Sequence, residues 1–576
     1  MAQKVIIMGA GIAGMSAAHE LIDRGFNVEI IEKQPVYIGG KARSEGATAG
    51  GLSNLPGEHG FRFFPGFYRH ITDTMKRIPF GANNVYKNLV KTDAILFARN
   101  AQDPLKVLAH FPFTAFDVNI IFQTLSGGVA STGLSSTEAD FFKQKIFQLI
   151  TSSDTRFNDE YEQTGWWYFI EADRFSPTYQ NLLADGLTRS MVAARAKTMS
   201  TRVGGSIFLQ LLFGLADPTI PADRVLNGPT NDTFLIPWYN YLISKGVIFH
   251  KNHEVMSINN VGDQVTNITA KDLSTNIITS LNADYYLLAV PVEKANVLLN
   301  ASLRGIDPTL SFTANLVPNV NWMNGIQFFL NVDIPISQGH VIHINSEWAV
   351  TCISQVQYWS NYDIDVATGG IIKGVISVDI SDWDALYKGI AAKNSTEPQL
   401  ISFVYEQMQT SLIVGGVPIL PVNMSAVVIG YHIGSSIKFI GGTINNEEPL
   451  LVNVVNGWAY MPKSWSTVKN LFLAGDYVRT NTNLATMEAA NESARRAVNC
   501  IIDASGTHIP YTKVWKLRSW KMLLPYKWYD KKRYNKGLPY SHNYPWWLYV
   551  AAFLWAIICL IAWVFKYIFN LIFGSL

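Results

Sequence analysis

The stretch KVIIMGAGIAGMSAAHELIDRGFNVEIIEK, residues 4–33, decides the fold of this 576-residue chain. Residues 5–8 are a continuous apolar run, which is typical of a parallel strand buried on both faces. A glycine-rich turn leads into a segment rich in alanine, Gly25 marks the end of that segment, and residues 28–31 are expected to form a second strand. The order strand, turn, helix, strand predicts a parallel α/β sheet.

The turn between these elements has the spacing of a dinucleotide-binding site. Gly9, Gly11 and Gly14 form G-x-G-x-x-G, in which the glycines allow a tight turn, close approach to a pyrophosphate and close helix–strand packing. The phosphates would lie at the helix N-terminus, where free N–H groups and the helix dipole favour anions. Glu32 ends the second strand 18 residues after Gly14, where it can accept hydrogen bonds from ribose hydroxyls.

A second glycine pair, Gly39-Gly40, follows closely, with Arg43 three residues further on. This loop can bring more backbone and a cation toward the same pyrophosphate. Read in isolation, it is also compatible with an ordinary loop that carries a surface arginine.

Near the other end of the chain, LFLAGDYVRTNT (471–482) is an apolar strand that runs into Gly475-Asp476 and a polar turn. LATMEAANESARRA (484–497) begins a long helix, which we expect from about Thr486 to Ile502.

Taken together, these motifs resemble the flavin amine oxidase superfamily. The resemblance implies FAD as cofactor, with Asp476 at the ribityl or pyrophosphate portion and backbone near Met487 at the flavin. "HKNHEVMSI" resembles the stretch whose Val255 backbone contacts adenine, and "ADYYLLAVP" the strand that reaches Pro291. The cofactor-binding residues expected from motif and resemblance are Gly9, Gly11, Ile12, Ala13, Gly14, Glu32, Lys33, Gly39, Gly40, Arg43, Gly60, Phe61, Arg62, Val255, Pro291, Gly475, Asp476, Thr486 and Met487.

Within this superfamily, the chain looks closest to the phytoene and carotenoid desaturases and the hydroxysqualene dehydroxylases. Monoamine-type oxidases place a tyrosine before the Met-Glu pair, whereas Thr486 stands here. The chain departs from the desaturase pattern at Ala489, where glycine is usual. "PGEHGFRFFPGFYRHI" (56–71) resembles the stretch that lines the flavin face, so Glu58, His59 and Arg62 are catalytic candidates. This stretch is also compatible with a structural loop.

The tail of the chain is the most apolar part of the sequence. Residues 546–565 contain no charge, about the length that spans a hydrocarbon core of about 30 Å. Residues 511–540 before them carry nine Lys or Arg against one acid, interleaved with Trp and Tyr. This predicts a single transmembrane helix with the main body in the cytoplasm. An interfacial helix or hairpin, or a buried core helix, are the alternatives.

We therefore expect a discontinuous, Rossmann-like α/β FAD-binding domain, an α+β substrate domain and a C-terminal transmembrane helix. The FAD-binding domain would comprise 1–80, 235–300 and 440–505, and the substrate domain 81–234 and 301–439. Residues 506–543 would form a basic aromatic juxtamembrane segment, and 544–573 the membrane anchor.

The function that this reading predicts is hydride transfer from a lipid or isoprenoid substrate to FAD, with a quinone as electron acceptor. A net charge of +2 gives no sign of a nucleic-acid partner, and the spacing of Cys, His and acids suggests no metal site. The alternatives are an amine oxidase, a redox-neutral flavin-dependent lipid isomerase, and a membrane-tethered flavin-binding protein without turnover.

Overall fold

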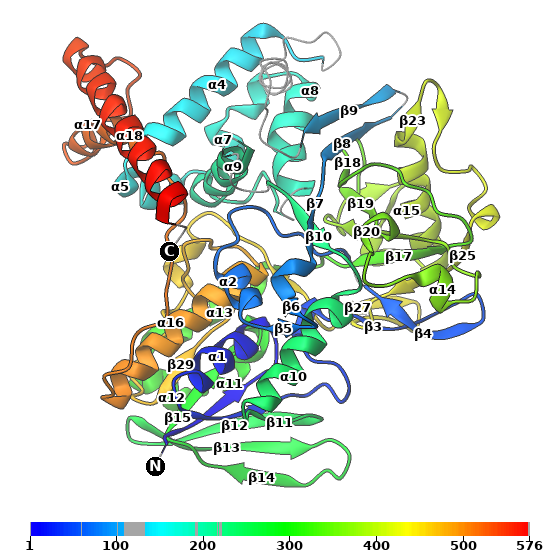
Figure 1. Ribbon diagram of the computed structural model, residues 1–576, viewed down its shortest axis with the longest axis vertical. Helices are drawn as coiled ribbons and strands as arrows, with labels where there is room; N and C mark the ends of the chain where they lie inside the picture. The colour runs from blue at the N-terminus through cyan, green and yellow to red at the C-terminus, as the bar shows by residue number, and fades with distance from the viewer. Residues whose placement is uncertain are drawn as a thin grey trace.

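The computed structural model describes residues 2–58, 60–100, 102–108, 133–190, 194–215, 217 and 222–573. Two sheets organise the chain (Figure 1). A five-stranded parallel sheet has the order β11-β2-β1-β15-β29, and a seven-stranded sheet the order β25-β17-β20-β19-β18-β8-β9. The α/β character that the N-terminal stretch predicts is therefore present.

Strands from three distant parts of the chain form the five-stranded sheet. They are β1 (Lys4–Met8), β2 (Asn27–Ile31), β11 (Ile248–His250), β15 (Tyr285–Leu288) and β29 (Leu471–Leu473). Val5 and Ile7 pack into one buried cluster, while Ile6 and Met8 pack into another on the opposite face. The continuous apolar run of β1 thus has a core on each side, as a central parallel strand requires.

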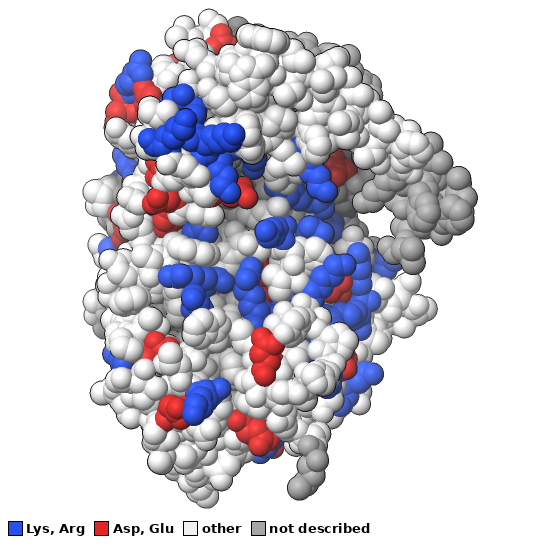
Figure 2. All heavy atoms as spheres, turned by 90° about the vertical axis from the view of Figure 1, so that its left-hand side faces the viewer, with Lys and Arg blue, Asp and Glu red and all other residues white. Residues whose placement is uncertain are grey.

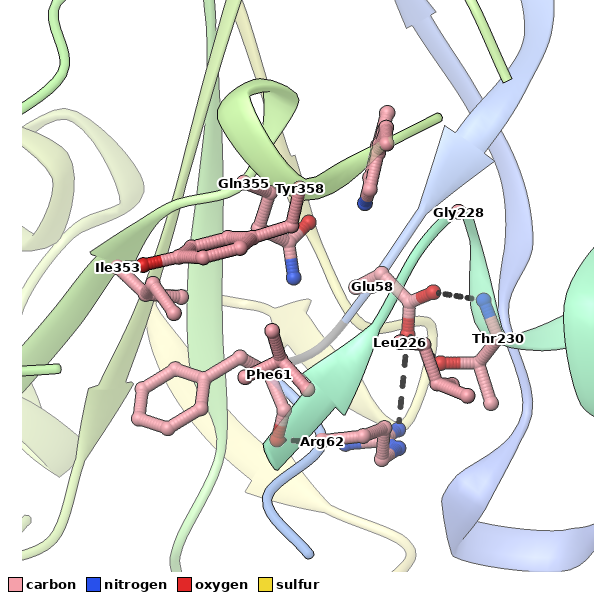
Figure 3. Close-up of a pocket in the computed structure, with 11 residues that line it drawn as sticks. Glu58, Phe61, Arg62, Leu226, Gly228, Thr230, Ile353, Gln355 and Tyr358 are labelled. Carbon is pink, nitrogen blue, oxygen red and sulfur yellow. Dashed lines mark hydrogen bonds and ion pairs between the residues drawn. The ribbon is translucent and has the colours of Figure 1, made fainter. Parts of the chain in front are cut away.

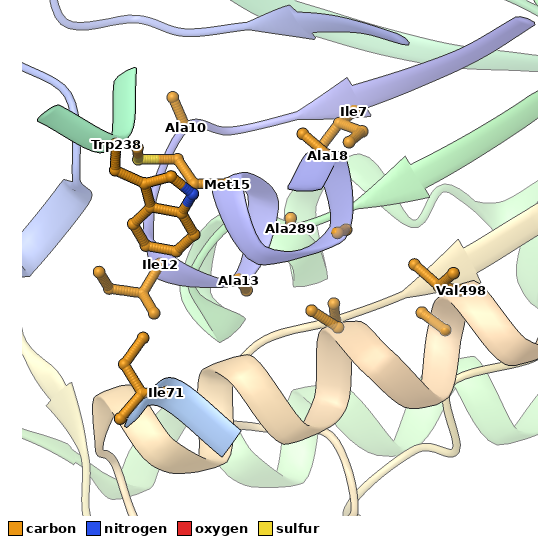
Figure 4. Close-up of a cluster of buried hydrophobic side chains, with 14 of the residues drawn as sticks. Ile7, Ala10, Ile12, Ala13, Met15, Ala18, Ile71, Trp238, Ala289 and Val498 are labelled. Carbon is orange, nitrogen blue, oxygen red and sulfur yellow. The ribbon is translucent and has the colours of Figure 1, made fainter. Parts of the chain in front are cut away.

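Helices α1 (Ile12–Ile22) and α16 (Met487–Ser505) lie side by side on one face of this sheet. Figure 4 shows Ala13 and Ala18 of α1 in the cluster that also holds Val498 of α16. Small side chains on α1 allow this close approach. The opposite face carries the antiparallel strands β12 (His253–Val261), β13 (Gln264–Asp272) and β14 (Ile278–Leu281), together with α11 (Val292–Leu298).

All strands of the seven-stranded sheet lie in the segments predicted as the substrate domain, 81–234 and 301–439. Its strands are β8 (Ala94–Arg99), β9 (Gln102–Leu108), β17 (Gly325–Leu330), β18 (Val341–His343), β19 (Val350–Ser354), β20 (Gly374–Ile380) and β25 (Val428–Ile433). Helix α15 (Glu397–Ser411) packs on it. The domain boundaries themselves stay a prediction.

Helices α4 (Ser136–Thr151), α5 (Asp154–Asn158) and α9 (Thr201–Leu215) form a separate layer above the five-stranded sheet (Figure 1). Helix α4 begins with a capping box: the Ser135 side chain accepts from the Glu138 N–H, and the Glu138 carboxylate accepts from the Ser135 N–H.

The prediction of a single transmembrane helix, a membrane anchor over 544–573 and a cytoplasmic main body is wrong. Helix α18 (Trp546–Phe573) forms over the apolar run, but within the described residues no helix is long and apolar enough to cross a bilayer.

The basic aromatic segment before α18 packs onto the body of the protein. Helix α17 (Leu524–Tyr534) lies against α18 and α5. The Asp530 carboxylate binds the Arg156 guanidinium with an Nε–Oδ1 distance of 2.9 Å, and both side chains are buried. Figure 2, which turns the side carrying α17 and α18 toward the viewer, shows Lys and Arg gathered on this face.

Candidate functional site

A cavity of about 1280 Å³ is lined by residues of both large sheets and of the loops between them. Most of the predicted cofactor residues line it: Gly9, Gly11, Ile12, Ala13, Glu32, Lys33, Gly39, Gly40, Arg43, Phe61, Arg62, Val255, Pro291, Gly475, Asp476, Thr486 and Met487. Gly14 and Gly60 are not among the lining residues, and His59 lies outside the described residues. Motifs separated by more than four hundred residues thus share one cavity.

The two glycine turns lie against each other at one end of this cavity. Gly11 and Gly39 form a parallel bridge, and the Gly39 N–H donates to the Ala10 carbonyl at 2.9 Å. A Cβ on Gly40 would come within 3.0 Å of the Gly11 Cα. The absence of side chains at both turns therefore leaves a backbone cradle of the kind that a pyrophosphate needs.

Glu32 lies beside this cradle, at the end of β2. Its carboxylate accepts from the Ala10 N–H at 2.6 Å and from the Gln34 N–H at 2.8 Å. Burial raises the pKa of Glu32, while these two N–H groups lower it in part. Because the side chain holds the glycine turn and lines the cavity, it can both shape the cradle and meet a ribose hydroxyl.

Arg43 lines the cavity, but its charge is already paired. The guanidinium contacts Glu45 Oε1 at 2.9 Å and Glu448 Oε1 at 2.8 Å. Burial lowers the pKa of Arg43, yet the two carboxylates outweigh burial and raise it above its ordinary value. In this arrangement Arg43 joins the second glycine loop to residue 448, which the sequence did not indicate.

Helix α16 begins at the cavity. The Thr486 hydroxyl accepts from the Ala489 N–H at 3.2 Å and caps the helix, and Met487 follows in the cavity wall. The N-terminus of a 19-residue helix directs a partial positive charge toward this space. It would stabilise negative charge on a bound group.

Glu293, on α11, is a cavity residue that the motifs did not indicate. Both of its carboxylate oxygens are buried without a hydrogen-bond partner among the described residues, and burial raises its pKa. A buried carboxyl without partners is costly unless a ligand supplies them. Together with the glycine cradle, Glu293 fits a site built for a hydroxyl-rich dinucleotide.

Of the catalytic candidates, Glu58 is held by structural contacts. Its carboxylate accepts from the Thr230 N–H at 2.8 Å and from the Ser44 hydroxyl at 2.8 Å. Figure 3 shows it turned toward Thr230 and Arg62 in a small separate pocket. Arg62 lines both this small pocket and the large cavity, and its guanidinium also donates to the Ala42 carbonyl at 3.2 Å. A catalytic role for Glu58 and Arg62 stays a prediction, and the contacts of Glu58 favour a role in positioning Arg62.

The far wall of the cavity comes from the seven-stranded sheet. It presents Thr351 and Asp379, and His340 from just before β18, among apolar side chains that include Ile95 and Ile342. Gly60 closes the gap to this sheet, since a Cβ there would lie 1.9 Å from Asp379 Oδ1. Sequence reasoning missed this wall, because single polar residues in apolar strands have no distinctive spacing.

A parallel sheet with a glycine cradle, a ribose-side carboxylate and a converging helix N-terminus defines a dinucleotide-dependent oxidoreductase. The family model described as flavin containing amine oxidoreductase matches residues 12–502, and the chain belongs to this family. Its cofactor is therefore FAD, which when bound supplies a two-electron acceptor.

The relatives found by sequence are zeta-carotene desaturases. The protein from Synechocystis sp. is 25% identical over 307 residues, which cover 52% of this chain and 60% of that protein. The Zea mays protein is 40% identical over 84 residues, which cover 14% of this chain and 13% of that protein. The matches thus span less than two thirds of each of these relatives.

Among solved structures, putrescine oxidase has the same fold. It matches with a TM-score of 0.58 and 12% identity, over 87% of this chain and 99% of that chain. An oxidoreductase from Methanosarcina mazei matches with a TM-score of 0.56 and 13% identity, over 87% and 100%. At these identities the likeness concerns the fold alone.

Proposed function

We propose that this flavoenzyme dehydrogenates an apolar lipid or isoprenoid chain, in the manner of a desaturase. The observation that carries the proposal is the continuity of the cavity. One end holds the glycine cradle, and the other reaches the seven-stranded sheet at Ile95 and Ile342, with Phe63 of the loop 61–65 beside them. Pockets for small ligands usually measure about 300–1,000 Å³, so a cavity of 1280 Å³ has room for more than a small ligand.

The relatives support the same class of substrate. Their names specify a carotenoid, which is a long apolar polyene. An allylic C–H bond of such a chain is a good hydride donor, because the resulting cation is delocalised. The protein's part would be to hold the chain, exclude water and orient the reacting carbon.

On the basis of the family resemblance, we propose that a quinone is the electron acceptor.

We further propose that the protein meets its substrate at a lipid surface. The exposed aromatic side chains of α18, such as Trp546 and Phe553, and the Lys and Arg residues of α17 support contact with an anionic lipid headgroup layer. Binding to phosphatidylserine vesicles that weakens with salt, with little binding to phosphatidylcholine, would support this partner.

Anaerobic mixing of the FAD-loaded protein with candidate substrates tests the reaction. Zeta-carotene or squalene should bleach the flavin absorbance, with a primary deuterium isotope effect when the allylic position is labelled. Putrescine and benzylamine should not bleach it, because Thr486 stands where monoamine-type enzymes carry a cage tyrosine. Rapid reduction by amines together with none by polyenes or fatty acids would overturn the proposal in favour of an amine oxidase.

A further inference from the structure

We propose that His340, held by Asp223, takes the proton that the substrate loses in the cavity. The inference rests on the proposed function, because a dehydrogenation releases a proton as well as a hydride. Neither residue belongs to a cofactor motif, and they lie 117 positions apart in the chain.

The strand register places His340 on the cavity side of the sheet. Ile342 of β18 pairs with Thr351 of β19, and Thr351 pairs with Asp379 of β20. Paired residues of neighbouring strands point to the same face, as do residues two apart in one strand. His340 precedes Ile342 by two residues, and all four side chains line the cavity.

One ring nitrogen of His340 is held and the other is available. Nδ1 lies 2.6 Å from Asp223 Oδ2, which also accepts from the Thr92 hydroxyl at 2.7 Å. A carboxylate can only accept, so Nδ1 carries the proton and Nε2 keeps its lone pair. Nε2 is buried and has no hydrogen-bond partner among the described residues.

The imidazole is also fixed in orientation. The Phe61 and Phe63 rings lie 4.7 and 4.9 Å from the His340 ring, centroid to centroid, and both line the cavity. Only 6% of His340 and 2% of Asp223 is exposed, so neither side chain can turn freely. A base of fixed orientation in the cavity wall meets one geometric requirement for proton abstraction.

The chemistry balances with this one base. One carbon of the substrate loses hydrogen with its electron pair, for which bound FAD is the acceptor. The adjacent carbon loses a proton to Nε2 of His340, and the electrons of that C–H bond form the new double bond. The imidazolium produced lies against the Asp223 carboxylate, which balances its charge.

Other charged and titratable groups surround this pair. Arg62 and Asp379 line the same cavity, and burial raises the pKa of Asp379 to about 7, while the Arg62 charge and the Phe61 N–H lower it in part. Asp93 and Tyr358 lie near Asp223. The pH dependence of the reaction therefore reflects all of these residues together. Only a comparison between variants separates the contribution of His340.

The test uses single-turnover reduction of the FAD-loaded protein by zeta-carotene across a range of pH. His340→Gln should slow reduction by about 10²- to 10⁴-fold, the usual contribution of a general base, with the flavin spectrum unchanged. It should also lose the rise in rate that deprotonation of the base causes in the wild-type protein. Asp223→Asn should also slow reduction, because the imidazolium that forms loses its counter-charge.

His343→Gln is the matched control. His343 lies on the same strand and is fully buried, but its ring nitrogens contact Ser411 Oγ and Cys352 Sγ on the side away from the cavity. In the folded variant, zeta-carotene should reduce the flavin at a rate within about twofold of the wild-type rate, since the substitution removes no group that faces the substrate.

A second readout does not depend on turnover. Nitrogen-15 NMR of the holoenzyme, labelled at histidine, should show His340 protonated at Nδ1 and free at Nε2 at neutral pH, and Asp223→Asn should weaken that preference. If His340→Gln does not retain FAD, the rate of flavin reduction in Asp223→Asn and the NMR spectrum test the role of His340 instead.

The role of His340 would be overturned if His340→Gln reduced its flavin with the rate and pH profile of the wild-type protein. A proton on Nε2 instead of Nδ1 in the wild-type protein would also overturn it. Failure of every polyene to reduce the wild-type flavin is a different result. It overturns the proposed function, and the role of His340 in it.

Discussion

At the residue scale, glycines at close backbone contacts and one buried carboxylate shape the cofactor site. A Cβ on Gly14 would lie 1.9 Å from the Gly9 carbonyl oxygen, so helix α1 could not pack against its own turn with any other residue there. Glu32 holds that turn through two backbone N–H groups. Removal of either feature should therefore affect the cofactor before it affects the rest of the fold.

Replacement of Glu32 or Asp476 by alanine should weaken FAD retention. The family resemblance implies that each carboxylate accepts a charge-assisted hydrogen bond from the cofactor, worth about 1.5–3 kcal/mol, so the FAD dissociation constant should rise about 10- to 100-fold. Equilibrium dialysis against free FAD measures it. Glu29→Ala is the control, because Glu29 lies on the same strand and pairs with Lys4 and His250. Equal FAD affinity in all four proteins would contradict the site.

Asp379 should make stability depend on pH. Burial raises its pKa from 3.8 to about 7, so the folded state keeps a proton that the unfolded state releases. This contribution to stability is complete below pH 4 and is lost as pH rises to about 7. The loss amounts to up to about 4 kcal/mol, at about 1.4 kcal/mol per pKa unit.

Asp379→Asn stays neutral and should lack this loss. Relative to wild type, the variant should gain stability between pH 4 and pH 8, as measured by urea unfolding. A difference between the two proteins that is constant with pH would show that Asp379 is ionised in the folded state.

At the element scale, α16 connects the cofactor cavity with the short helix α2 (His70–Lys76). The carboxylate of Glu488, in the first turn of α16, accepts from the backbone N–H groups of Arg69 at 2.8 Å, His70 at 2.9 Å and Ile71 at 3.0 Å. These are the N–H groups that the first turn of a helix leaves without partners. An acidic residue from another helix thus provides the N-terminal cap of α2.

Glu488→Gln should destabilise the protein by about 2–3 kcal/mol, because an amide offers one acceptor where three N–H groups need a carboxylate. The free energy of unfolding from urea titration measures this. Glu406→Gln, which removes an exposed carboxylate paired with Lys388, should change stability by no more than about 0.5 kcal/mol. Equal effects of the two substitutions would show that Glu488 does not cap α2.

At the scale of the whole molecule, a buried ion pair holds the C-terminal segment to the helical layer. Arg156 is fully buried on α5, and Asp530 on α17 is 2% exposed. The Ser153 N–H also donates to Asp530 Oδ2 at 2.8 Å, and Arg156 donates to the Leu538 carbonyl at 2.9 Å. The segment is therefore attached at α17, before α18 begins.

Asp530→Asn should loosen this segment, because the buried Arg156 guanidinium loses its buried carboxylate partner and keeps only Glu160 and the Leu538 carbonyl, at a cost of about 1.5–3 kcal/mol. Limited proteolysis should cut within 511–545 much sooner than in wild type, while the flavin absorbance stays. Asp154→Asn is the control from the same helix pair. Its carboxylate is 90% exposed and 3.7 Å from Lys527, so its loss should change little. Unchanged proteolysis in Asp530→Asn would contradict this attachment.

The sequence by itself determined the parallel sheet and the cofactor cradle. The roles of Gly9, Gly11, Gly14 and Glu32 depend on local backbone geometry, and such geometry requires particular residues at particular spacings. The C-terminal helix shows the limit of composition, because the apolar run at 546–565 predicted a span that the described structure does not contain.

Only the tertiary structure decided which polar residues face the cavity from the other side. His340, Asp223 and Asp379 come from segments with no spacing in common, and the register of β18, β19 and β20 brings them to one wall. Tertiary packing also turned Arg43 toward Glu45 and Glu448. Strand order and register are set by the packing of the whole sheet, which no single stretch of sequence encodes.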